Sequence, residues 1–200
     1  MSKDPQNLED MIEGVEHLAE EKEKVSLGDA LDEFGSRSYG PFLVLLPLLE
    51  FSPLGGIPGV PTGLAVLIAL IAVQILFGKK HIWLPAFVQN RKVKSKKIGA
   101  FAERLEGTAE KIDSLFHKRL QSLTHGWPVR AQALIIIALC AMVPPLEVVP
   151  FASSAPMMAI AAFGLALLMR DGLLTLIAGA LSIGSIYLVF TTVLSGGGGG

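Results

Sequence analysis

The sequence predicts an all-α, polytopic membrane protein with two repeated re-entrant helical hairpins, one C-terminal transmembrane helix and cytoplasmic amphipathic helices. All 17 lysines and arginines lie in residues 1–37, in residues 79–130 or at Arg170. The intervening stretches are apolar, as expected where a buried cation is costly in hydrocarbon. The mean hydropathy of +0.54, with 51% hydrophobic residues, is too high for an ordinary soluble globule. Together these patterns indicate several membrane segments separated by polar loops.

The N-terminal region is acidic and is predicted to be helical. Apolar residues recur at helical spacing across residues 6–24, with acids between them. A second helix is expected to begin at Ser26, which can cap it, with Asp29 completing a variant of the capping box. A fraying acidic tail is the alternative for residues 1–22. We treat residues 1–25 as an acidic N-terminal segment.

Residues 26–90 are predicted to form the first membrane repeat. The apolar run 41–49 is far shorter than the roughly 20 residues that a spanning helix needs. A second apolar run, 62–77, follows a break rich in proline and glycine that prevents one continuous helix. The main breakers are Pro53, Pro58 and Gly59. We therefore expect a half-helix that enters the membrane, a turn at depth and a second helix that leaves; ordinary crossings are the alternative.

Residues 127–195 repeat this plan and add a last span. The apolar run 131–143 is followed by a break, and a second apolar run leads to Arg170. The breakers here are Pro144, Pro145 and Pro150. Paired broken helices of this kind are typical of transporter sites, often in inverted repeats. Residues 172–194 carry no charge and are the one stretch expected to cross the bilayer completely.

The positive charges predict the orientation. Residues 79–130 carry twelve bases against four acids, and within them residues 91–126 are predicted to form amphipathic helices on the membrane surface. The N-terminus and residues 79–130 should face the cytoplasm of a bacterial inner membrane. A basic loop between membrane segments gives no indication of nucleic-acid binding. Membrane lipid and a second copy of the chain are the expected partners, and residues 196–200 are interpreted as a glycine linker remnant.

Five residues are candidates for a substrate or ion site. Glu50 and Glu147 each lie in a break, where burial would raise the pKa of a carboxyl group and make it a proton or cation site. The alternative is a break that reaches the far interface and leaves both glutamates in water. Gln74, Arg170 and Asp171 are the other candidates, and each has a structural alternative. These are an interhelical hydrogen bond, a cytoplasmic anchor and the N-cap of the last helix, respectively.

No motif indicates an enzyme. The four histidines are scattered without metal-ligand spacing, and the single cysteine, Cys140, lies in an apolar run outside any nucleophile motif. We expect no metal, no cofactor and no catalytic residue.

An ordered set of short motifs resembles the ExoD family across about residues 25–192. The matching residues are Leu27-Gly28-Asp29-Ala30-Leu31, Gly35, Arg37, Gly40, Pro58-Gly59, Gln74, Gly78, Trp83-Leu84-Pro85 and Arg170-Asp171-Gly172. The resemblance implies a bacterial integral membrane protein associated with exopolysaccharide synthesis, with polysaccharide synthesis machinery as a further partner. It implies no established reaction.

Two functions remain open from the sequence. The first is transport, or assistance to transport, of a polar or lipid-linked solute, coupled to protons through Glu50 and Glu147. The second is a non-catalytic scaffold or regulator of a polysaccharide synthesis complex. An enzyme acting on a lipid-linked sugar is a weaker third possibility.

Overall fold

The computed structural model describes residues 8–34, 39–51, 55, 57–79, 81–90, 92–95, 121–147 and 152–196. Its elements are α1 (Leu8–Glu21), β1 (Lys24–Ser26), α2 (Leu27–Phe34), α3 (Tyr39–Glu50), α4 (Val60–Leu76), α5 (Ala86–Gln89), β2 (Lys92–Lys94), the 3-10 helix η1 (Gln121–Thr124), α7 (Trp127–Leu146), α8 (Ser154–Met169) and α9 (Gly172–Gly196). The all-α prediction is confirmed apart from one short pair of strands.

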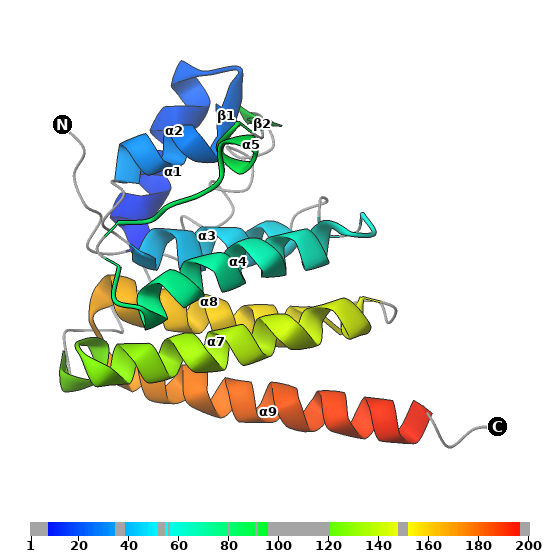
Figure 1. The fold of residues 1–200 in the computed structure, drawn as a ribbon. Helices are drawn as coiled ribbons and strands as arrows, with labels where there is room; N and C mark the ends of the chain where they lie inside the picture. Colours follow the sequence, from blue (N-terminus) through cyan, green and yellow to red (C-terminus); the bar gives the residue numbers. More distant parts are fainter. Residues whose placement is uncertain are drawn as a thin grey trace.

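The N-terminal helices α1 and α2 form a small unit beside the main bundle (Figure 1). The amphipathic prediction for α1 is confirmed, because its apolar residues from Leu8 to Leu18 are the buried ones. The capping box is also confirmed. The Asp29 amide donates to Ser26 Oγ over 3.1 Å, and the Ser26 amide donates to the Asp29 carboxylate over 2.7 Å. This reciprocal pair satisfies backbone donors that the start of α2 would otherwise leave free.

The pairing of β1 with β2 was not predicted. The two strands are antiparallel, with Val25 opposite Val93, and they bring the N-terminal unit against the segment that follows α5. Ser95 strengthens this contact, because its amide donates to the Glu23 carbonyl and its hydroxyl donates to the Lys22 carbonyl. Strands of three residues carry too little alternation to be recognised from sequence.

Two helical hairpins form the centre of the molecule (Figure 1). The first consists of α3 and α4 and the second of α7 and α8; α3 packs on α8, and α4 packs on α7. We call the end that carries Glu50, Gly59, Glu147 and Ser153 the turn end, and the opposite end the base end. Both hairpins turn at the turn end, so they point in the same direction. The two hairpins are therefore not inverted relative to each other, unlike the inverted repeats in which paired broken helices often occur.

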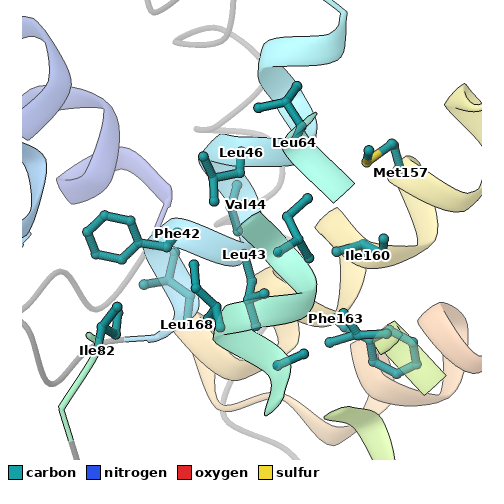
Figure 2. Close-up of a cluster of buried hydrophobic side chains, with 14 of the residues drawn as sticks. Phe42, Leu43, Val44, Leu46, Leu64, Ile82, Met157, Ile160, Phe163 and Leu168 are labelled. Atoms are coloured by element: carbon teal, nitrogen blue, oxygen red, sulfur yellow. The ribbon is translucent and has the colours of Figure 1, made fainter. Parts of the chain in front are cut away.

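The core lies where α3 is enclosed by its neighbours (Figure 2). Leu43 and Leu46 of α3, Ile160 and Phe163 of α8, and Ile68 of α4 are almost fully buried. The backbones of α3 and α8 approach closely because Gly164 has no side chain: a Cβ there would lie 2.5 Å from the Leu43 carbonyl carbon. Pro47 supports this approach, because it lacks the N–H group that would otherwise bind the Leu43 carbonyl.

Two helices within the described residues are long and apolar enough to cross a bilayer, namely α7 and the first 20 residues of α9. Residues 172–194 were predicted to be the one stretch that crosses completely, but helix length does not single them out, because α7 is long enough as well. The helix α7 starts earlier than the apolar run, at Trp127, and continues through Pro144 and Pro145. Each of these prolines removes one i→i−4 hydrogen bond, but they lie in the last turn of the helix, which the Glu147 amide closes by donating to the Val143 carbonyl. The break of the second hairpin therefore begins after Pro144 and Pro145, which belong to α7.

The first break is confirmed at Pro58 and Gly59, where the chain turns and Gly59 adopts a positive φ of 86° as the N-cap of α4. A β-carbon would be strained in this left-handed conformation, which explains why glycine occupies the position. Pro53 and Pro150 lie outside the described residues, as do most of the predicted surface helices of residues 91–126 and the final glycines 197–200. The helix α3 remains short, with 12 residues and a length of about 18 Å.

Candidate functional site

The Glu147 carboxylate joins the end of α7 to the start of α4. Glu147 is the residue that closes the C-terminus of α7, and Gly59 is the N-cap of α4. One carboxylate oxygen accepts a hydrogen bond from the Gly59 amide and the other accepts one from the Thr62 hydroxyl. The helices α4 and α7 are antiparallel, so the end of one necessarily lies beside the beginning of the other. Glu147 is half-buried in this position.

Glu50 makes the corresponding contact between α3 and α8. It is the last residue of α3, and one of its oxygens accepts a hydrogen bond from the hydroxyl of Ser153, the N-cap of α8. Glu50 is only 8% exposed and Ser153 only 5%. The other carboxylate oxygen of Glu50, Oε2, is buried and has no hydrogen-bond partner among the residues that the structure describes. Such an atom is costly unless a proton, a cation or a solvent molecule satisfies it.

The two contacts form a reciprocal exchange between the hairpins. Each glutamate ends the first helix of its own hairpin and binds the beginning of the second helix of the other hairpin. The C-terminus of a helix repels negative charge and the N-terminus attracts it, so both carboxylates gain from this exchange. Glu50 ends α3 and Glu147 closes α7, so both carboxylates lie at the turn end. The turn end thus gathers two acids, one of them with an unused oxygen.

Gln74 belongs to a structural contact and not to this group. Its amide nitrogen donates to the Leu70 and Trp83 carbonyls, and its carbonyl oxygen accepts from the Trp83 amide over 2.6 Å. Gln74 therefore fastens the segment after α4 to the base end of that helix. The predicted interhelical hydrogen bond is not the one found, because the partners of Gln74 lie in its own helix and in the extended segment that contains Trp83.

Arg170 and Asp171 also lie at the base end, away from both glutamates. Arg170 is exposed and ends α8 with a positive φ of 54°. Asp171 is fully buried, and its Oδ1 atom accepts a hydrogen bond from the Leu173 amide over 2.8 Å. The prediction that Asp171 caps the last helix is confirmed. The five candidates therefore occupy one site at the turn end and separate places at the base end.

Sequence reasoning missed two participants, Ser153 and Thr62. Ser153 is the N-cap of α8, but its side chain makes no hydrogen bond to its own helix and donates to Glu50 instead. A serine beside a helix start is ordinarily a local cap, and a partner 103 residues away leaves no trace in a single sequence. The position of Thr62 gave a weak indication of its role. It lies three residues after the N-cap glycine, where a polar side chain can contact a capping acid.

The fold defines a class of protein. It is a small all-α protein with two helices of bilayer-crossing length and with two hairpins that hydrogen bonds join at their turns. The family model described as "Exopolysaccharide synthesis, ExoD" matches residues 8–191. The chain belongs to the ExoD family, as its motifs indicated.

Two relatives illustrate this membership. The chain is 30% identical to Protein ExoD of Rhizobium meliloti (strain 1021) over 171 residues, covering 84% of this chain and 68% of that protein. It is 28% identical over 181 residues to an uncharacterized protein of Synechocystis sp., covering 83% of this chain and 81% of that protein. No solved structure matches the chain significantly. The family associates the protein with exopolysaccharide synthesis.

Proposed function

We propose that the protein is a multi-pass inner-membrane protein that transports, or helps to transport, a polar or lipid-linked solute of exopolysaccharide synthesis, with Glu50 as its proton-binding residue. The observation that carries the proposal is the buried, unpartnered Oε2 atom of Glu50 at the crossing of the two hairpin turns. Family membership supplies the biological process, and the turn end supplies a buried carboxyl group that can take up a proton.

The apolar exterior supports a membrane position. Large apolar side chains that a soluble protein would hide are exposed along the bundle, including Val66 at 62%, Ile183 at 71% and Phe190 at 64%. Trp83 and Trp127 are exposed at the base end, where interfacial tryptophans are expected if that end meets the cytoplasmic headgroups. On this view α3, at about 18 Å, and the end of α7 at the same turn end both stop within the bilayer, although α7 has the length to cross it. Irregular backbone at that depth survives only beside protein or water.

Protonation gives Glu50 a chemical role in such a site. Its Oε1 atom already accepts from Ser153, so a proton on Oε2 makes that atom a donor to an oxygen of the solute. Loss of the proton returns a charge next to Glu147, and the two carboxylates repel each other. Solute binding and proton binding at Glu50 are thereby coupled.

Purified protein in liposomes tests this role. We would follow transbilayer movement of a fluorescent polyprenyl-phosphate lipid while the external pH is varied. The native protein should show a pH-dependent rate, and Glu50→Gln, which cannot ionise, should show a rate independent of pH. Glu13→Gln, which changes an exposed acid of α1, is the matched control and should behave as the native protein does. A Glu50→Gln variant that retains the native pH profile would remove Glu50 from the mechanism.

The depth of the turns is tested separately by cysteine labelling. Ile57 lies at the turn end and is 50% exposed, whereas Cys140 is buried and is first changed to alanine. If the turns end within the bilayer, Ile57→Cys should resist a membrane-impermeant maleimide added to intact cells. Rapid labelling from outside would show that α3 and α4 reach the periplasmic surface and would contradict the re-entrant arrangement.

The acidic face of α1 favours a second candidate, a scaffold for polysaccharide synthesis proteins. The apolar side of α1 is buried against the chain, while Glu13 and Glu20 are exposed on its other side. The double variant Glu13→Lys/Glu20→Lys should reduce recovery of partner proteins in crosslinked membranes and leave lipid movement unchanged. Unchanged recovery would remove this surface from consideration. Homodimerisation remains a prediction that the same crosslinking experiment addresses.

A further inference from the structure

A second buried polar group lies at the base end, far from the two glutamates. It consists of Gln132 on α7 together with Asp171 and Thr175 at the beginning of α9, and we call it the base cluster. Asp171 is 0% exposed, Gln132 3% and Thr175 9%. The 3-10 helix η1 packs against both α7 and α9 at this point. Three polar side chains are thus enclosed where the last helix joins the second hairpin.

The hydrogen bonds of Gln132 determine which of its atoms is free. Its amide nitrogen donates to the Leu123 carbonyl over 2.7 Å and to the Thr175 hydroxyl oxygen over 3.4 Å. A carbonyl oxygen can only accept, so the nitrogen must face Leu123, and the side chain cannot be flipped without losing this bond. The Gln132 Oε1 atom is left buried, with no partner among the described residues.

Asp171 has an unused oxygen as well. Its Oδ1 atom accepts from the Leu173 amide, while Oδ2 is buried and has no partner in the described part of the chain. Within the described residues no ion pair involves Asp171, and its neighbour Arg170 lies exposed at the surface. A fully buried carboxylate without a countercharge is expensive. The α8 C-terminus two residues earlier adds partial negative charge to the same corner.

We propose that the base cluster binds one small monovalent cation of the sodium type, with Asp171 Oδ2 and Gln132 Oε1 as ligands and Thr175 Oγ1 beside them. Both unpartnered atoms are oxygens that accept, so a guest that satisfies both of them must be electropositive. One carboxylate balances a single positive charge. Divalent ions generally take more acidic ligands, and no group of three or more His, Cys, Asp or Glu that could hold a metal occurs in the described chain.

The bound ion would join α9 to the second hairpin. Asp171 belongs to the start of α9 and Gln132 to α7, so one ion that binds both holds the two helices together at the base end. This site is independent of the turn end and does not rest on the proposed transport function.

Thermal unfolding of the full chain in detergent tests the proposal. Sodium chloride should raise the apparent Tm by several degrees in a saturable way, and choline chloride at equal ionic strength should not. Asp171→Asn should abolish the sodium response. Glu50→Gln should retain it, and loss of the response in Glu50→Gln instead would place the ion at the turn end and overturn the assignment.

A second variant covers the case in which Asp171→Asn fails to fold. Gln132→Leu removes a neutral ligand and should raise the sodium concentration for half-saturation by about tenfold, the change expected from one contact of hydrogen-bond strength. Equal effects of sodium and choline, or an unchanged half-saturation in Gln132→Leu, would show that a water molecule suffices in the cluster and would overturn the proposal.

Discussion

The Glu147 carboxylate binds the amide of Gly59, and this one contact joins parts of the chain that are 88 residues apart. Gly59 is the residue that lets the first break turn, and Glu147 is the residue on which α7 ends. The acid therefore supplies the cap that the glycine, having no side chain, cannot provide for α4. The two hairpins depend on each other at the position where each reverses direction.

The hydrogen bonds of Glu147 predict that two substitutions at this position lower the stability of the protein by different amounts. Glu147→Ala leaves the Gly59 amide and the Thr62 hydroxyl without their acceptor and should lower the free energy of unfolding by about 1–3 kcal/mol. Glu147→Gln keeps a carbonyl oxygen for the Gly59 amide and should lose less. Denaturant titration in mixed micelles measures both. Equal losses in the two variants would mean that the contact depends on charge alone.

The close approach of α3 and α8 predicts that Gly164→Ala is destabilising. A Cβ at this position would lie 2.5 Å from the Leu43 carbonyl carbon and 2.6 Å from its oxygen, and backbone atoms cannot rotate away. We expect a loss of about 1–3 kcal/mol, typical of overpacking. The control is Gly184→Ala in α9, where a Cβ meets nothing within 4 Å. It should be neutral or stabilising by up to about 1 kcal/mol, because alanine favours helix more than glycine does.

The contacts of Gln74 predict a structural phenotype without a transport phenotype. Gln74→Leu leaves the Trp83 amide and carbonyl unpaired and should lower the apparent Tm, with a free-energy cost of about 1–3 kcal/mol. The pH profile of lipid movement should be unchanged, since Gln74 lies at the base end. Gln89→Leu, which removes a single bond to the Leu84 carbonyl, should cost less. An altered pH profile in Gln74→Leu would return this residue to the functional site.

The N-terminal capping box predicts a loss of stability in acid. Hydrogen bonds from Lys22, and then from Ser26, lower the pKa of Asp29 from 3.8 to about 2. The folded pKa lies below the unfolded one, so Asp29 stabilises the protein above about pH 4 and loses this effect as the pH falls towards 2. The difference in apparent Tm between the native protein and Asp29→Asn should therefore be clear near pH 6 and small near pH 2. A difference that does not vary with pH would exclude ionisation of Asp29 as its cause.

Local patterns explain which elements could be predicted. The spacing of apolar residues located α1, and the Ser26 and Asp29 pair located the start of α2, since both signals lie within one or two helical turns. The extent of α7 could not be predicted in the same way. Pro144 and Pro145 ordinarily end a helix, and only the hydrogen bond of the Glu147 amide shows that they lie within its last turn.

The candidate site was predicted in part. Two acids in apolar surroundings are conspicuous, so Glu50 and Glu147 could be named from the sequence. Their partners Ser153, Thr62 and Gly59 could not, because each pair is brought together by the packing of one hairpin on the other. The same holds for Gln132 and Asp171, which look like an ordinary helix residue and an ordinary N-cap until α7 and α9 are placed side by side.

The sequence by itself determined the helical class, the membership in the ExoD family, the two breaks and the acids that accompany them. These depend on composition and on short-range spacing, both of which are written directly in the chain. The tertiary structure decided that the two hairpins point the same way, that each acid caps a helix of the other hairpin, and that Gln132 lies beside Thr175 of α9. These relationships arise from antiparallel packing, which brings the end of one helix to the beginning of another, whatever their separation in sequence.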